Sequence, residues 1–73
     1  MTQLTHAQYD ILERAIMAGS RVALRRRASR ESVIIPLRLE TEGRREVIST
    51  RNPTTGHEMR IYLDEIESIE AVG

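Results

Sequence analysis

The stretch from Ser32 to Leu39 constrains the fold most, because it is the most apolar run of the chain and contains a proline. In a β-strand, every second side chain points to the same face of the sheet. The apolar residues that follow this period are Val33, Ile35, Leu37 and Leu39. Pro36 has no N–H to donate, so it belongs at an edge, a bulge or a bend. We therefore predict a long strand that bends near Pro36 and contributes to the core on both sides of the bend.

The rest of the chain predicts one helix and four more strands. A helix over about residues 5–18 is indicated by Thr5 and Gln8, which fit a capping box, and by Gly19, which fits a left-handed cap. Turn residues separate the strands, most clearly at 52–56. The predicted strands span residues 21–27, 32–40, 44–51, 57–63 and 66–72. Residues 1–73 are thus expected to form a single α+β domain, an N-terminal helix followed by a five-stranded antiparallel small barrel.

Alternation also predicts which side chains of the last two strands face the core. In the fourth strand these are Met59, Ile61 and Leu63. In the fifth strand the apolar positions are Ile66, Ile69 and Val72. Together with the helix, these residues would give a chain of this size a small core.

Charge is unevenly distributed although the net charge is zero. All eleven basic residues are arginine, and residues 21–60 hold ten of them against five acids. Residues 61–73 hold four acids and no basic residue. The absence of cysteine excludes a disulfide framework and a thiolate metal site, and it fits a cytoplasmic protein. No apolar run approaches the roughly 20 residues that span a bilayer, so no membrane association is expected.

The order of motifs resembles the WYL domain family. The matching segments are Ile11–Ile16, Gly19–Leu24, Pro36–Leu39 and Arg60–Ile66. This resemblance implies a helix leading into an SH3-like or Sm-like barrel. It also implies a bacterial regulatory module that binds nucleic acid or a nucleotide through basic and aromatic residues. The Trp-Tyr-Leu signature of the family falls on Arg45, Glu46 and Val47, so the third position alone keeps its apolar character.

A second resemblance is to the small Rho-binding antiterminators. It rests on Tyr9-Asp10, Leu12-Glu13 and Ala15 in the helix and on Glu58–Asp64 near the end of the chain. These proteins are free-standing Sm-like barrels with an N-terminal helix, and they act on the transcription terminator through acidic surfaces. Both resemblances therefore imply much the same fold but different partners.

No enzymatic motif is found in the sequence. His6 and His57 lack a partner at metal-ligand spacing, and there is no glycine-rich phosphate loop. We therefore expect a protein that is not an enzyme and needs neither a metal nor a cofactor.

The arginines support two interpretations. In the first, outward-facing guanidinium groups on neighbouring strands form a patch that binds nucleic acid or a nucleotide-like anion. The candidate ligand contacts, chosen for strand face and clustering, are Arg25, Arg27, Arg38 and Arg45. In the second, the same surface is a solvated face of cross-strand ion pairs. The acids available for such pairs are Glu31, Glu40, Glu46 and Glu58.

An alternative function uses the acidic residues, as the antiterminator resemblance implies. A protein of the transcription machinery would then be the partner. The candidate contacts for that partner are Asp10, Glu13, Asp64, Glu65 and Glu67. The basic middle and acidic end of the chain also suggest a homo-oligomer formed through edge strands, as a further hypothesis.

Overall fold

The computed structural model describes residues 4–72 and contains one helix, five strands and a short 3-10 helix. The elements are α1 (His6–Ala18), β1 (Val22–Arg26), β2 (Glu31–Glu42), β3 (Arg45–Arg51), β4 (Glu58–Tyr62), η1 (Leu63–Glu65) and β5 (Ile66–Ala71). A helix followed by five antiparallel strands confirms the predicted α+β fold class.

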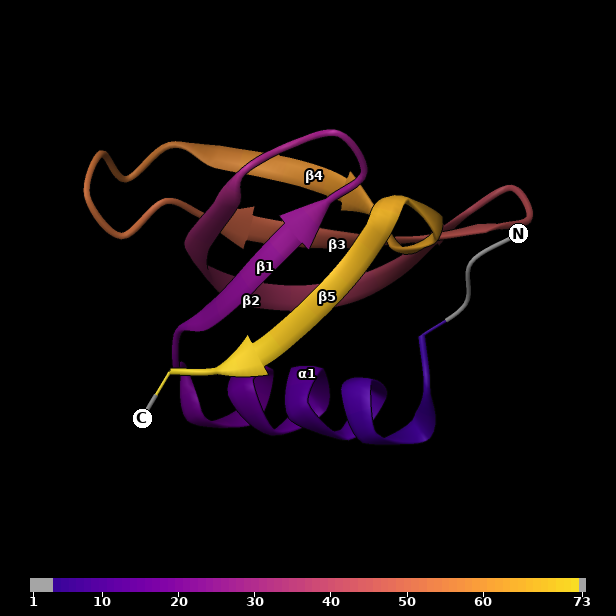
Figure 1. Cartoon of the computed structure of the whole chain (residues 1–73), viewed down its shortest axis with the longest axis horizontal. Helices are drawn as coiled ribbons and strands as arrows, with labels where there is room; N and C mark the ends of the chain where they lie inside the picture. The colour runs from indigo at the N-terminus through magenta and orange to yellow at the C-terminus, as the bar shows by residue number, and fades with distance from the viewer. Residues whose placement is uncertain (1–3, 73) are drawn as a thin grey trace.

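The strands form one sheet in the order β4-β3-β2-β1-β5. β2 serves both halves of this sheet. Its first part, up to Ile34, pairs with β1, and its second part, from Ile35 onward, pairs with β3. Because one strand has two partners in succession, the sheet curls around it into a small barrel-like body (Figure 1). β4 and β5 are the edges, and η1 connects them.

The face of β2 that enters the core differs from the prediction. Ile34 and Pro36 are buried, whereas Val33 is 40% exposed. The register shifts between Pro36 and Arg38, and beyond this shift Leu39 packs against the core. The sequence predicts a bend near Pro36, and the structure has a bulge there. The bulge moves the core-facing positions from even to odd residue numbers. Before the proline, odd and even positions both carry apolar residues. Alternation alone therefore predicts the wrong face of the strand there.

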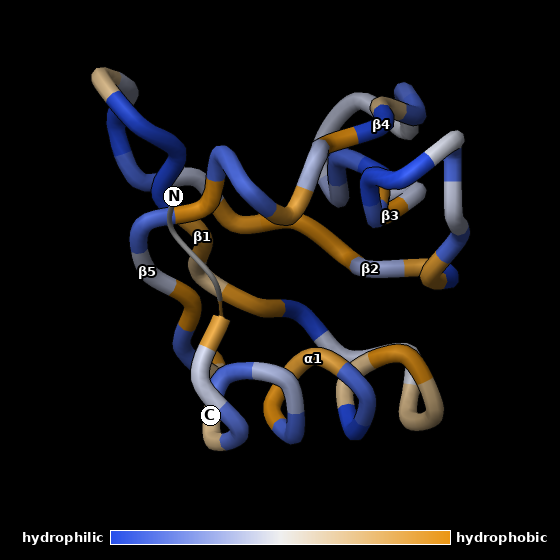
Figure 2. The backbone as a smooth tube through the Cα atoms, turned by 90° about the vertical axis from the view of Figure 1, so that its right-hand side faces the viewer, coloured by the Kyte–Doolittle hydropathy of each residue, from blue (hydrophilic) through white to orange (hydrophobic). Residues whose placement is uncertain are grey.

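The helix begins and ends as its sequence predicts. Thr5 Oγ1 accepts from the Gln8 N–H at 3.1 Å, and the Gln8 side chain accepts from the Thr5 N–H at 2.8 Å. Gly19 ends the helix with φ 67°, a left-handed conformation that costs glycine little. α1 packs on β5 and β2 and lies as a layer beneath the sheet (Figure 2), burying Leu12 and Ala15.

A tyrosine ties the helix to the third strand. The Tyr9 hydroxyl donates a hydrogen bond to the Glu46 carboxylate. Burial, followed by this hydrogen bond, raises the pKa of Tyr9 to about 12. This contact joins α1 to the sheet at a point 37 residues away along the chain.

The core lies between α1 and the curled sheet. The buried residues that form it are Leu12, Ala15, Val22, Leu24, Ile34, Ile48, Ile61, Leu63, Ile66 and Ile69. Among the core residues predicted for the last two strands, two are not in this set, since Met59 is 44% exposed and Val72 is 43% exposed. Met59 lies near the start of an edge strand and Val72 follows the end of the other one. β4 and β5 each have a neighbouring strand on one side alone, so residues at their ends are less covered.

Candidate functional site

Polar side chains form a row across three strands on the outer face of the sheet. Arg38 of β2 is paired with Ser49 of β3, and Ser49 is paired with Arg60 of β4. Directly opposed residues share a face of the sheet. We call this face, which carries Arg38, Ser49 and Arg60, the outer face. The opposite face of the same strands carries Ile48 and Ile61 into the core.

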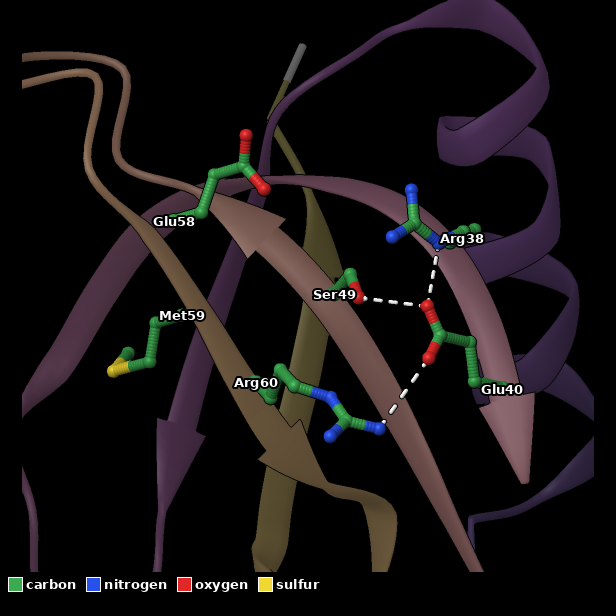
Figure 3. Close-up of a pocket in the computed structure, with 6 residues that line it drawn as sticks. All are labelled: Arg38, Glu40, Ser49, Glu58, Met59 and Arg60. Atoms are coloured by element: carbon green, nitrogen blue, oxygen red, sulfur yellow. Dashed lines mark hydrogen bonds and ion pairs between the residues drawn. The ribbon is translucent and has the colours of Figure 1, made fainter. Parts of the chain in front are cut away.

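Glu40 lies two residues from Arg38 on β2 and accepts hydrogen bonds from all three members of this row (Figure 3). Its carboxylate accepts from Arg38 Nε at 2.5 Å, from Ser49 Oγ at 3.1 Å and from Arg60 Nη2 at 3.3 Å. The bond from Arg38, then that from Ser49, holds the pKa of Glu40 below its usual value. Arg60 also reaches Glu42, at 2.9 Å.

A hollow of about 450 Å³ adjoins these groups. It is lined by Arg38, Glu40, Ser49, Glu58, Met59 and Arg60. The Met59 side chain points away from Glu40, whereas Glu58 lies on the far side of Ser49 from Arg60 (Figure 3). Glu58 pairs with Arg51 at 3.7 Å. The hollow is therefore bounded by charged groups of both signs.

A second set of charges surrounds η1. The Arg45 guanidinium makes two hydrogen bonds to Asp64, at 3.0 and 2.8 Å, and lies 3.6 Å from Glu65. It also stacks over the Tyr62 ring, 3.5 Å from the ring centroid. The hydrogen bonds from Arg45 hold the pKa of Asp64 below its usual value and raise that of Arg45. We call Arg45, Tyr62, Asp64 and Glu65 the η1 cluster.

Three of the four arginines predicted to contact a ligand are paired with acids. Arg45 belongs to the η1 cluster, Arg38 pairs with Glu40, and Arg25 lies 3.7 Å from Glu67. The fourth, Arg27, donates its backbone N–H to the carbonyl of Glu65 at 2.9 Å, which places it beside the η1 cluster. The structure thus brings Arg27 and Arg45 to one end of the barrel and leaves Arg38 on the outer face.

The predicted acidic contacts fall into two groups. Asp64, Glu65 and Glu67 face arginines of the barrel, as described above. Asp10 and Glu13 lie on α1, where Asp10 pairs with Arg14 at 3.1 Å and Glu13 is exposed. The five acids therefore belong to separate elements, two to α1 and three to η1 and β5.

The arginines without an acidic partner concentrate in one turn. Six arginines form ion pairs with acidic side chains. Within residues 4–72, the other five arginines have no acidic side chain within 4.0 Å. These five are Arg21, Arg26, Arg27, Arg30 and Arg44. Three of them belong to the segment 26–30, which runs from the last residue of β1 to the start of β2 and which we call the arginine turn. It lies at the end of the barrel opposite α1 (Figure 1).

The sequence predicts only part of the arginine turn and part of the row on the outer face. The four candidate ligand contacts include Arg27 but not Arg26 or Arg30, although Arg25–Arg27 and Arg30 lie close together in the sequence. They include Arg38 but not Ser49 or Arg60, because the sequence does not show which residues of β3 and β4 lie opposite Arg38.

Residues 4–72 contain no group of three or more histidine, cysteine or acidic side chains that could hold a metal ion. Within the same residues, no helix has the length and apolar character needed to cross a membrane.

Comparisons with known proteins define the class of fold. No family model matches the sequence, and no curated protein matches it either. Among solved structures, the chain is similar to proteasome accessory factor B/C (PafBC) of Arthrobacter aurescens, with a TM-score of 0.80 and 23% identity. The similarity covers 99% of this chain and 13% of PafBC. PafBC contains WYL domains, so the likeness supports a WYL-like fold. This chain spans about an eighth of the length of that protein.

Proposed function

We propose that this chain is a non-enzymatic regulatory module that binds nucleic acid or a nucleotide-like anion through the arginine turn. The observation that carries the proposal is the gathering of Arg26, Arg27 and Arg30 in one turn without an acidic partner among the described residues. The likeness to PafBC, a regulator that contains WYL domains, supports the regulatory role.

Unpaired guanidinium groups are the ones most available to phosphate. A guanidinium can donate two parallel hydrogen bonds to a phosphate group, and it remains charged at any physiological pH. The arginines of the outer face and the η1 cluster already donate to carboxylates, so binding a phosphate there would first break those bonds. The arginine turn binds without that cost. Binding through it would be dominated by charge and would weaken with salt.

Titration of the protein with a short single-stranded oligonucleotide tests this proposal. The double variant Arg27→Gln and Arg30→Gln should bind more weakly than the wild type. Loss of two phosphate contacts should also flatten the slope of log K against log salt by roughly 1.4. The matched control is the double variant Arg21→Gln and Arg44→Gln, which removes the same charge from two arginines that also lack an acidic partner.

The two variants separate specific from general electrostatic binding. If both lower the affinity and the salt slope equally, the turn has no special role and the proposal fails. No detectable binding by the wild type at low salt would also contradict it.

The alternative, a protein partner held by acidic surfaces, would draw mainly on α1. Asp64, Glu65 and Glu67 face arginines, which leaves Asp10 and Glu13 as the acids away from the barrel. Under our proposal, charge reversal at Glu13 should not reduce oligonucleotide binding. Loss of function in the cell with Glu13→Arg, but not with the arginine-turn variant, would favour the protein partner instead.

A further inference from the structure

We propose that the outer face carries a second binding site, for a small molecule with a single carboxylate or phosphate head. When no ligand is bound, the Glu40 carboxylate occupies this site. The site uses no residue of the arginine turn, so it stands or falls independently of the proposed function. It is formed by Arg38, Ser49 and Arg60, with Glu40 as the internal occupant.

The donors of the site converge on one point from three strands. Ser49 is 5% exposed and forms the floor, and its hydroxyl donates to Glu40. Arg38 and Arg60 flank it from β2 and β4, with side chains that are 65% and 52% exposed. Two guanidinium groups and a hydroxyl directed at the same carboxylate are a donor set that recognises an oxyanion. The register of the sheet places Arg38, Ser49 and Arg60 opposite one another, so their positions on the strands do not depend on Glu40.

Glu40 is suited to exchange with an incoming oxyanion. Its side chain is 31% exposed and lies on the same strand as Arg38, so rotation about its own bonds carries the carboxylate into solvent. A ligand oxyanion would then accept the same hydrogen bonds from Arg38, Ser49 and Arg60. The exchange replaces ion pairs with equivalent ion pairs, and exposed pairs of this kind hold weakly.

The surroundings limit which ligand can enter. The hollow of about 450 Å³ beside the donors leaves room for the rest of a small molecule. Glu58 borders the same hollow, and its carboxylate would repel a second negative charge. A ligand with one acidic head is therefore favoured over a polyanion such as a nucleic-acid backbone, which distinguishes this site from the arginine turn.

The test is an NMR titration of the full chain with benzoate and with phenyl phosphate, following the backbone amide of Ser49. Glu40→Gln keeps the size of the side chain but removes the competing charge. It should tighten binding by about tenfold, from millimolar Kd in the wild type. The two probes distinguish a carboxylate head from a phosphate head, since the preferred one will show the lower Kd in this variant.

Glu42→Gln is the matched control. It removes the same charge from the same strand and also loses a contact with Arg60, but Glu42 does not contact Ser49. It should leave the Kd within about twofold of the wild type. Adding Ser49→Ala or Arg60→Gln to Glu40→Gln should abolish the gain. Two variants are used so that a loss of fold in one, seen as collapsed amide dispersion, does not decide the result.

Three outcomes would overturn the proposal. The first is the absence of saturable shifts with either probe in Glu40→Gln. The second is an equal gain in Glu42→Gln, which would indicate a general effect of charge. The third is loss of probe binding in the arginine-turn variant Arg27→Gln and Arg30→Gln, which would assign the binding to the other site.

Discussion

The two faces of β3 differ in what covers them, although both are buried. Ile48 faces inward and belongs to the apolar core together with Ile61. Val47 is equally inaccessible, but it lies on the outer face between its cross-strand neighbours Glu40 and Tyr62. Arg45, two residues earlier on the same face, stacks over that tyrosine. One face is thus covered by hydrocarbon and the other by a layer of ion pairs and an aromatic ring.

This difference separates stability from binding. Apolar burial stabilises the fold in proportion to the area removed from water, at about 25 cal/mol per Å². The outer layer is held by hydrogen bonds between exposed charges, for which a ligand or water can substitute. The inner face therefore fixes the geometry of the strands, and the outer face presents groups whose partners can be exchanged.

The largest expected effect comes from the inner face. Ile48→Ala should lower the free energy of unfolding by about 3 kcal/mol, because it leaves a cavity among well-packed neighbours. That is a large share of the stability of a small domain. Urea denaturation measures the change. A loss below about 1 kcal/mol would show that the core collapses around the cavity, contrary to the packing described here.

A smaller effect is expected from the outer face. Val47→Ala removes two methyl groups from a side chain with no accessible surface, which should cost about 1.5 kcal/mol. The same denaturation experiment measures it. A loss equal to that of Ile48→Ala would mean that the ionic layer packs as tightly as the core, and the contrast between the two faces would disappear.

Local sequence signals predicted the ends of the helix and the class of fold. Thr5 with Gln8, and Gly19, form their caps within a few residues, so no distant contact is needed to interpret them. The position of the barrel's bend was also readable, because Pro36 cannot donate to a ladder. The sequence does not show which face of β2 enters the core. Val33 and Ile34 are both β-branched and apolar, and the choice between them depends on the pairing with β1 and on the bulge that follows.

The candidate site was less predictable than the fold for a similar reason. The sequence supplied the arginines but not their partners, since pairs such as Arg45 with Asp64 join residues that are 19 positions apart. Whether an arginine is free or paired depends on how the strands curl. Arg27 illustrates this. Strand face and clustering predict it together with Arg45, whereas in the structure both lie beside η1, Arg27 through its backbone N–H and Arg45 through its guanidinium.

The smallest effect concerns pH and the η1 cluster. Arg45 holds the pKa of Asp64 below its unfolded value of about 3.9. A carboxyl group whose pKa is lower in the folded state stabilises the fold above its unfolded pKa, and this contribution disappears as the pH falls through the folded value. Asp64→Asn should therefore be less stable than the wild type at pH 7, by less than Val47→Ala, and the gap should close below about pH 4.

The control for this titration is Glu13→Gln, which removes one negative charge from an exposed residue of α1 outside the ion pairs of the barrel. Stability curves of both variants against the wild type, measured by urea denaturation between pH 2 and 7, isolate the contribution of the Arg45–Asp64 pair. If the gap for Asp64→Asn stays constant with pH, the carboxylate charge does not stabilise η1. Hydrogen bonds that do not require the charge would then hold the η1 cluster. The outer face would depend less on charge, and so resemble the inner face more, than its ion pairs suggest.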